Sequence, residues 1–282
     1  MVDLAYEWIW MLTDYGQRDG FVAACRGVVA RIAPTVRVAD ITHDVPAGDV
    51  RHGAVVLAQT VPYLPPSVVV AVVDPGVGGS RRGLALAAGA SILVGPDNGL
   101  LLWAADVLGG VTAAVEPSEP AYHLPSPAHT FHGRDVFAPV AAHLAAGVAL
   151  SALGSALAVD DLARLRVPRV EIRAGVLETE VLAVDRFGNV QLAARDADLQ
   201  AAGLARGPVE VAVRDRAYAV VLASTFGDVA AGDLIVFVDS AGHIAIAVNG
   251  GAAAAELGLS PGDAVLVTRL PEPTVEPSWS AQ

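Results

Sequence analysis

Apolar residues in the first half of the chain follow two spacings that alternate along the sequence. Short apolar runs predict strands at residues 9–13, 36–40, 68–73, 84–88, 91–94 and 111–115. Apolar residues that recur every three or four positions predict helices at residues 20–33, 50–60, 100–108 and 136–146. The run 68–73 is typical of a strand buried on both faces. The alternation predicts an α/β domain with a mainly parallel sheet.

The second half has a different pattern, in which short β-rich runs are separated by Gly, Asn and Asp. Strands are predicted at residues 170–173, 176–184, 209–213, 217–222, 234–238, 244–248 and 264–268, and helices only near 196–202 and 251–257. This pattern indicates a small all-β domain, barrel-like or a sandwich. We therefore expect an α/β domain over residues 1–166, a β-barrel-like domain over 167–270, and a loose Pro-, Glu- and Ser-rich tail over 271–282.

Composition limits the classes of partner and compartment. Of the 282 residues, 54% are hydrophobic, which is ample for a packed core, but no apolar run is long enough to cross a bilayer. A formal net charge of −12 argues against nucleic acids and anionic membranes as partners. Cys25 is the only cysteine, so no internal disulfide is possible, and a cytoplasmic location is expected.

Polar residues that packing does not require follow several predicted strands. They lie in the segments 13–16, 74–82 and 95–99, and a fourth polar segment, 130–135, precedes the helix predicted from residue 136. Ligands of open α/β sheets bind beyond the carboxyl ends of the strands, so these segments are the candidate site. The glycine-rich segment 74–82 lacks the Gly-Lys-Ser/Thr ending of a P-loop and the spacing of a dinucleotide fingerprint, so both are rejected.

Some of these polar residues also have ordinary structural interpretations. Asp14 alone could cap a turn, and for Asp135 we favour a helix cap. His123, His129 and His132 lie close together in sequence. Their spacing is not a recognised zinc pattern and no cysteine accompanies them, so no metal is predicted.

Taken together, five motifs resemble those of one family over nearly the whole chain. They are Val73-Asp74-Pro75-Gly76-Val77-Gly78, Gly95-Pro96-Asp97-Asn98-Gly99, Phe131-His132-Gly133-Arg134-Asp135, Asp185-Arg186-Phe187-Gly188-Asn189 and Val248-Asn249-Gly250-Gly251. In this order and at these distances, they are similar to those of the adenosine-forming S-adenosyl-L-methionine (SAM) hydrolases. These enzymes are also called SAM hydroxide adenosyltransferases and are related to fluorinase and chlorinase.

The resemblance implies a function and a set of site residues. The implied reaction is hydrolysis of SAM to adenosine and L-methionine by in-line attack of water on the ribose 5′ carbon, with no cofactor. Three positions match the residues that handle the water: Asp74, Arg81 and His132. Six match substrate contacts: Asp14 (ribose hydroxyls), Phe131 (a wall near the reacting carbon), Asp185 (methionine ammonium), Asn189 (adenine), Phe226 (adenine stacking) and Ser240 (methionine carboxylate). Members are homotrimers whose sites lie at subunit interfaces, between the α/β domain of one subunit and the β domain of its neighbour.

Departures from the related halogenases favour water as the nucleophile. Those enzymes have a tyrosine where Asp74 stands and a threonine where Val77 stands, and fluorinase has an arginine where Ala241 follows Ser240. The missing arginine weakens the assignment of the methionine carboxylate contact. Two other functions stay open: a halogenase of the same fold, and a non-catalytic protein that binds an adenosyl ligand. Whether Asp74 or His132 takes the proton of the water is also open.

Overall fold

The computed structural model describes residues 5–204 and 206–270, and the tail predicted at 271–282 lies outside them. The chain divides into two compact units, Met1–Arg166 and Val167–Gln282. Each unit has its own hydrophobic core, and each is described by itself. No helix of the described residues is long and apolar enough to span a membrane.

The first unit is built on a seven-stranded sheet with the order β2-β1-β3-β5-β4-β6-β7. The strands are β1 (Trp8–Thr13), β2 (Arg37–Thr42), β3 (Val68–Val72), β4 (Gly83–Ala88), β5 (Ser91–Pro96), β6 (Val111–Glu116) and β7 (Ser155–Ala156). Neighbours from β2 to β5 are parallel, whereas β4 runs antiparallel to both β5 and β6. The predicted α/β domain with a mainly parallel sheet is confirmed.

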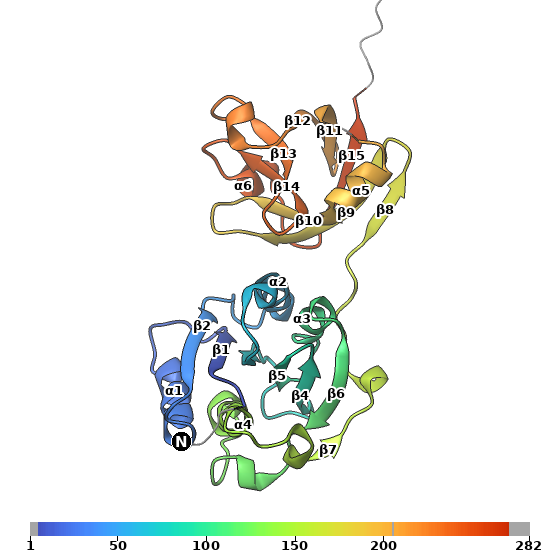
Figure 1. Ribbon diagram of the computed structural model, residues 1–282. Coiled ribbons are helices and arrows are strands. Elements are labelled where there is room, and N and C mark those ends of the chain that lie inside the picture. The colour runs from blue at the N-terminus through green and yellow to red at the C-terminus, as the bar shows by residue number, and fades with distance from the viewer. Residues whose placement is uncertain (1–4, 205, 271–282) are drawn as a thin grey trace, which may run out of the picture. The chain divides into compact units, whose positions relative to one another are not determined.

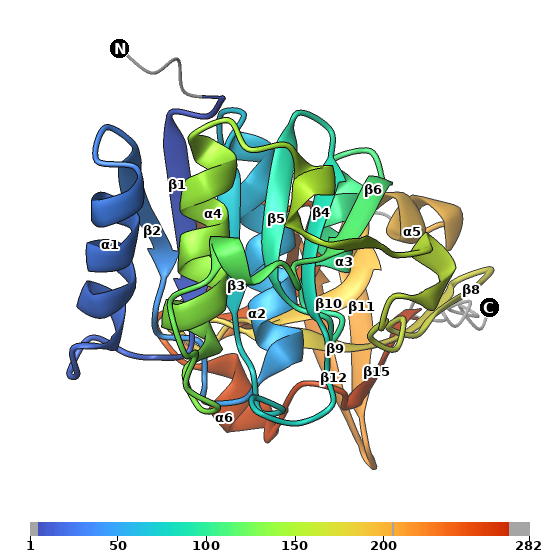
Figure 2. The ribbon, with the colours of Figure 1, turned by 90° about the horizontal axis from the view of Figure 1, so that it is seen from below.

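Helices cover both faces of this sheet (Figure 1). They are α1 (Phe21–Ile32), α2 (Val50–Thr60), α3 (Leu102–Val107) and α4 (Ala138–Ala145). Short helical turns are η1 (Val61–Tyr63), η2 (Pro120–Tyr122), η4 (Leu150–Leu153) and η5 (Val159–Asp161). Figure 2 shows α4 in front of the sheet, on the face that it shares with α1. The other face packs against α2 and α3, so alternate residues of β3 enter two different cores, as the apolar run predicts.

The predicted helix 136–146 has a different beginning from the one expected. A π-helical turn, η3 (Gly133–Phe137), precedes α4, and His132 occupies its N-cap position. Asp135 is buried inside this turn, so its predicted role as a cap of the following helix is wrong. Its carboxylate instead accepts a hydrogen bond from the backbone N–H of Ala128 at 2.8 Å and pairs with Arg134. Asp135 therefore holds the preceding loop against the turn.

The second unit is a closed β-barrel of seven strands, which confirms the barrel-like domain. Its eight strands have the order β10-β14-β13-β12-β11-β15-β9-β8, and β9 closes a ring of seven by pairing with β10, so that β8, which pairs with β9, lies outside the ring. The strands are β8 (Val170–Arg173), β9 (Val176–Val184), β10 (Val190–Arg195), β11 (Gly207–Val213), β12 (Arg216–Leu222), β13 (Leu234–Val238), β14 (His243–Val248) and β15 (Ala264–Arg269). The helices are α5 (Asp196–Ala201), η6 (Phe226–Asp228) and α6 (Ala253–Leu257).

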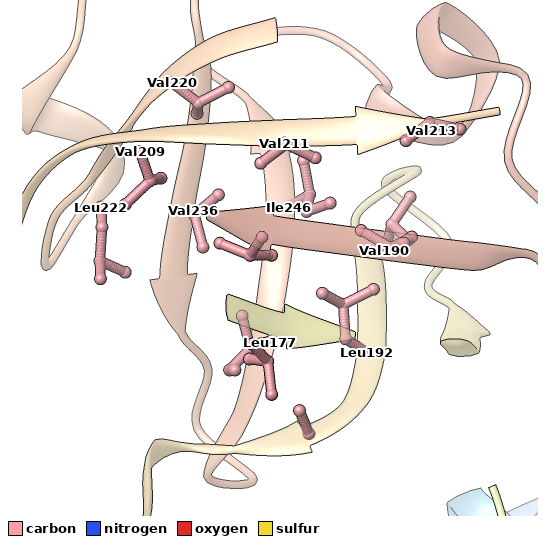
Figure 3. Packing of buried hydrophobic residues seen from close by; sticks show 14 of the residues in the cluster. Leu177, Val190, Leu192, Val209, Val211, Val213, Val220, Leu222, Val236 and Ile246 are labelled. Carbon is pink, nitrogen blue, oxygen red and sulfur yellow. The ribbon is translucent and has the colours of Figure 1, made fainter. Parts of the chain in front are cut away.

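The barrel is filled by aliphatic side chains that point inward from successive strands (Figure 3). Leu177, Val211, Val236 and Ile246 are each at most 1% exposed and belong to one core cluster. Burial of such a side chain stabilises the fold by about 1.5–3 kcal/mol. Strand β10 was not predicted, although it closes the barrel, because its sequence is short of the β-branched residues that mark the other strands.

Candidate active site

A pocket of about 580 Å³ lies in the first unit, where β1 and β3 end. Asp14 directly follows β1, and Asp74 comes two residues after β3. The residues that line the pocket are Asp14, Tyr15, Phe21, Val72, Asp74, Val77, Ala128, Thr130, Phe131, His132, Gly133 and Arg134. Four residues predicted for the site, namely Asp14, Asp74, Phe131 and His132, therefore line a single pocket at the carboxyl ends of parallel strands, as such sheets favour.

The loop after β3 is shaped by glycine and by hydrogen bonds that bring the 74–82 segment back on itself. The N–H of Val77 donates to the carbonyl of Asp74 at 3.2 Å. Gly78 has a φ of +76°, and a side chain there would overlap the carbonyl oxygen of His129. Only glycine meets both conditions without strain. The turn returns the chain so that Arg81 faces Asp74.

Arg81 joins the carboxylate of Asp74 to the imidazole of His132. Its Nε lies 2.9 Å from Asp74 Oδ1 and 3.0 Å from Oδ2, and its terminal nitrogen forms an ion pair with Oδ2. The same terminal nitrogen lies 2.9 Å from His132 Nδ1. The Asp74 and Arg81 side chains are only 6% and 13% exposed, so water screens this pair weakly. The three residues predicted to handle water are thus joined through Arg81.

The contact with Arg81 fixes the hydrogen-bonding role of each nitrogen of His132. A guanidinium only donates hydrogen bonds, so Nδ1 must accept, and the proton of the neutral ring lies on Nε2. Burial lowers the pKa of His132, and the positive charge of Arg81 lowers it further. His132 is therefore a neutral imidazole at neutral pH, whose Nε2–H can donate a hydrogen bond.

Aromatic rings form one wall of the pocket. The Phe131 ring packs edge-on against Tyr15, with centroids 5.6 Å apart, and against Phe21 at 5.3 Å. The Arg134 guanidinium lies over the other side of Phe131, 4.9 Å from its centroid. Burial and the nearby carboxylates raise the pKa of Tyr15, so its hydroxyl stays protonated. A side chain at Gly133 would overlap that hydroxyl, which explains a glycine at this position.

Asp14 reaches a neighbouring loop from the end of β1. Its Oδ2 accepts a hydrogen bond of 2.8 Å from the backbone N–H of Gly48. Asp14 thus does hold a turn, as its ordinary structural interpretation predicts, and it also lines the pocket. In the described part of the chain no cation is paired with it. Its negative charge is available to a ligand.

The segment 95–99, which the sequence also placed among the candidate loops, does not line the pocket. Asn98 donates to the carbonyl of Val73 at 2.8 Å and so secures the end of β3. Asp97 is buried and accepts from Arg82 at 2.7 Å and from the N–H of Ala163 at 2.9 Å. Both side chains support neighbouring segments, so this loop has a structural role.

The remaining predicted site residues belong to the barrel unit. Asp185 accepts hydrogen bonds from the N–H of Phe187 at 2.8 Å and from the amide side chain of Asn189 at 2.7 Å. Phe226 is 40% exposed, and its ring lies 5.1 Å from that of Phe237. Ser240 is exposed in the turn between β13 and β14. Phe226, Ser240 and Asp185 are therefore exposed, and the Asp185 carboxylate is also held by Asn189.

Several residues that line the pocket were given no individual role by the sequence. Tyr15, Thr130 and Arg134 lie in the candidate segments, whereas Phe21 lies outside them. The position of Tyr15 directly after Asp14 was a usable signal, because both follow the same strand end.

Among the described residues, no group of three or more His, Cys, Asp or Glu side chains has an arrangement that could hold a metal ion.

An α/β unit with a ligand-sized pocket at the carboxyl ends of its strands, followed by a closed β-barrel, defines a two-domain protein that binds a small molecule. Family models identify it further. The SAM hydroxide adenosyltransferase N-terminal domain matches residues 9–154, and the C-terminal domain of the same family matches residues 179–266. The chain belongs to the SAM hydroxide adenosyltransferase family.

Individual relatives agree with this membership. A Salinispora tropica protein named (R)-S-adenosyl-L-methionine hydrolase is 56% identical over 261 residues, which cover 93% of this chain and 97% of the relative. A Thermus thermophilus protein of the same name is 41% identical, over 90% of this chain and 96% of its own length. A fluorinase of Actinoplanes sp. is 29% identical, over 92% and 96%. The crystal structure of an uncharacterized conserved protein from Thermotoga maritima superposes with a TM-score of 0.87 at 35% identity, covering 93% of this chain and all of that one.

Proposed function

We propose that this protein hydrolyses SAM to adenosine and L-methionine. The observation that carries the proposal is the contact of Asp74, Arg81 and His132 at a pocket that Asp14 and Phe131 also line. Three relatives at 41–57% identity over most of the chain have the name (R)-S-adenosyl-L-methionine hydrolase, which supports this substrate.

The reaction is an in-line displacement at the 5′ carbon of the ribose. The water oxygen forms a bond to this carbon, the carbon–sulfur bond breaks, and methionine leaves as a neutral thioether. One proton of the water is released, and it carries the positive charge that the sulfonium had before the reaction. Because the sulfonium is already a good leaving group, the enzyme must chiefly position the weak nucleophile. No metal or organic cofactor is needed for these steps.

We infer that Asp74, and not His132, takes the proton. His132 Nδ1 is occupied by Arg81, and Nε2 carries a proton, so the ring can donate to the water oxygen but has no free acceptor. The Asp74 carboxylate can only accept hydrogen bonds. Asp74 therefore takes the proton as the carbon–oxygen bond forms, while His132 orients the water and Arg81 holds both groups in place.

A product assay tests this function. Purified protein with SAM should release adenosine and methionine in equal amounts, measured by chromatography, and a metal chelator should leave the rate unchanged. A halogenated nucleoside in the presence of chloride or fluoride would show a halogenase instead. Binding of SAM without any product would show a binding protein. Asp74→Asn should lower kcat about 100-fold or more while KM changes little, since general-base help is typically worth about 10²–10⁴-fold.

We further propose a homotrimer in which the barrel of one subunit completes the pocket of its neighbour, with a cytoplasmic location. In this arrangement Phe226 stacks on adenine, Asn189 contacts adenine, Asp185 binds the methionine ammonium and Ser240 the carboxylate. The exposed faces of Phe226 and Ser240 support these roles. The single buried thiol of Cys25 suits a reducing compartment.

Mixing two variants with defects in different halves of the site tests the shared site. Subunits with Asp74→Asn and subunits with Phe226→Ala are unfolded together, refolded and assayed at a SAM concentration far below the KM of Phe226→Ala, where both single variants are slow. In a ring with head-to-tail contacts, about a quarter of the sites then combine two intact halves and recover activity. If each site belonged to one chain, no intact site would form, and the mixture would be no faster than the average of its components. Light scattering gives the number of subunits independently.

A further inference from the structure

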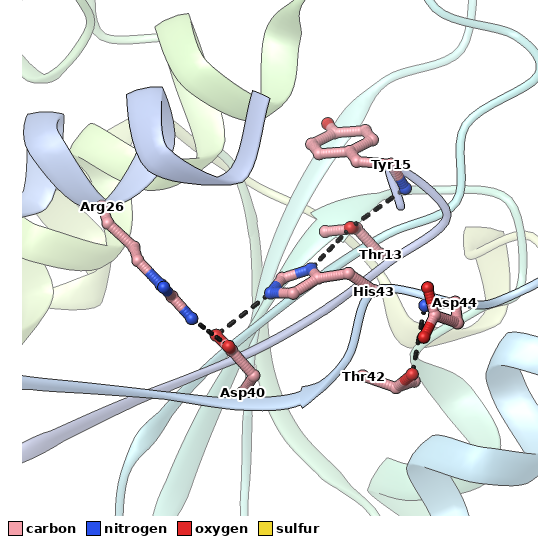
Figure 4. Close-up of polar contacts among 7 residues, drawn as sticks. All are labelled: Thr13, Tyr15, Arg26, Asp40, Thr42, His43 and Asp44. Atoms are coloured by element: carbon pink, nitrogen blue, oxygen red, sulfur yellow. Dashed lines mark hydrogen bonds and ion pairs between the residues drawn. The ribbon is translucent and has the colours of Figure 1, made fainter. Parts of the chain in front are cut away.

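A chain of polar side chains, which is buried at its inner end, lies behind the loop that carries Asp14 and Tyr15 (Figure 4). Thr13 Oγ1 lies 2.8 Å from Nδ1 of His43, and both side chains are buried. Nε2 of His43 lies 3.0 Å from Oδ1 of Asp40, whose other oxygen pairs with Arg26. Neither Nε2 nor Oδ1 forms a hydrogen bond of regular geometry within the described chain, so each depends on this close contact with the other. We call Thr13, His43, Asp40 and Arg26 the relay.

One arrangement of protons gives each contact of the relay a donor and an acceptor. The Asp40 carboxylate only accepts, so His43 carries its proton on Nε2. A neutral ring then accepts at Nδ1, and the Thr13 hydroxyl donates to it. The hydroxyl oxygen keeps a lone pair that accepts the backbone N–H of Tyr15 at 3.2 Å. The relay therefore runs from the partly exposed Arg26 to the backbone of the pocket.

Backbone hydrogen bonds tie the same two segments together. The N–H of Gly16 donates to the carbonyl of His43 at 2.7 Å, and the N–H of Val45 reaches the carbonyl of Thr13 at 3.4 Å. Asp14 and Tyr15, which line the pocket, lie between these attachment points. A displacement of His43 must therefore move both of them.

We infer that His43 is a positioning residue, which fixes the Asp14–Tyr15 loop for substrate through Thr13. This inference rests on the proposed function. An apolar pair of the same size would fill the space behind the loop without the cost of burying polar groups. It could not, however, hold the Tyr15 amide in one direction. The relay does so, and it keeps the carboxylate of Asp14 at the depth where the ribose hydroxyls are proposed to bind.

Kinetics of near-isosteric variants of the full-length protein test this role. Thr13→Val and His43→Leu remove the hydrogen bond between the two side chains and change their volume little, whereas Thr13→Ser keeps the hydroxyl. We expect KM for SAM to rise about tenfold in the first two, the factor that one lost hydrogen bond of ordinary strength gives. We expect kcat to fall less than threefold, and the double variant to resemble either single one, because both lose the same contact. Thr13→Ser should restore the wild-type KM.

A matched control separates positioning from general packing. His143→Leu makes the same substitution at a half-buried histidine of α4, which contacts Tyr122 and lies outside the pocket. It should leave KM and kcat unchanged, and urea unfolding should measure its loss of stability. The inference is overturned if Thr13→Val and His43→Leu lose stability but keep the wild-type KM, or if Thr13→Ser is as impaired as Thr13→Val. A wild-type protein that neither binds nor cleaves SAM would instead overturn the proposed function, and this inference with it.

Discussion

Replacement of Arg81 by lysine tests whether the planar guanidinium, and not only its charge, organises the site. Arg81 contacts both oxygens of Asp74 and, from its terminal nitrogen, Nδ1 of His132 at 2.9 Å. A lysine ammonium keeps the ion pair with Asp74, but its single nitrogen cannot reproduce this planar set of contacts. The loss is one hydrogen bond from a charged donor, worth about 1.5–3 kcal/mol. Arg81→Lys should therefore lower kcat by about 10- to 150-fold, since about 1.4 kcal/mol corresponds to a factor of ten.

The assay compares kcat and KM for adenosine release with the free energy of unfolding in urea. KM should stay within about threefold, because Arg81 is not proposed to touch the substrate. Arg82→Lys is the matched control: its guanidinium binds Asp97 at 2.7 Å and the carbonyl of Asp161, away from the pocket. That variant should lose stability but keep kcat. A kcat for Arg81→Lys within twofold of wild type would refute the argument that the guanidinium orients His132.

Three further predictions follow from particular contacts. Burial and a neighbouring positive charge lower the pKa of His132, so its neutral form persists below pH 6.5. The fall in kcat on the acid side should therefore lie below pH 6.5. A fall centred at or above pH 6.5 would contradict the neutral Nε2–H form. Phe226→Ala should raise KM about 5- to 100-fold with little change in kcat, since stacking of a base on an aromatic ring is worth about 1–3 kcal/mol. An unchanged KM would show that Phe226 is not part of the adenine site. Gly95→Ala should destabilise the protein by about 1–3 kcal/mol in urea unfolding, because the added methyl group overlaps the carbonyl oxygen of Ala71. A variant as stable as the wild type would show that β3 and β5 can move apart at this point.

Hydrophobic spacing predicted the α/β sheet and most of the barrel, because both depend on which side chains must be buried. It failed at β10, where residues 190–195 contain only one β-branched residue. This segment is a strand because β9 and β14 pair with it on its two sides, and that information lies far away in the sequence. It also failed at residues 133–137, where a π-helical turn replaces the expected start of a helix.

The candidate site was predictable where a polar residue follows a strand end, and less so where polar groups support one another. Asp14 and Asp74 were found because parallel strands end at one edge of the sheet. The loop at Asp97 has equally polar residues, but the structure uses them to hold neighbouring segments. The sequence analysis gave His43 no role, because its hydrogen-bond partner Thr13 becomes a neighbour only when β1 and β2 pair.

The charges around the pocket also bear on the choice of nucleophile and substrate. Asp74 is neutralised by Arg81, and Arg134 by Asp135, whereas Asp14 has no cationic partner in the described chain. This leaves one negative charge, which attracts a sulfonium and repels a halide ion. A water molecule has no charge to be repelled, and it can donate its proton to the carboxylate of Asp74, an acceptor that a halide ion does not need. The charge of Asp14 and the acceptor at Asp74 therefore both favour water over fluoride or chloride as the nucleophile.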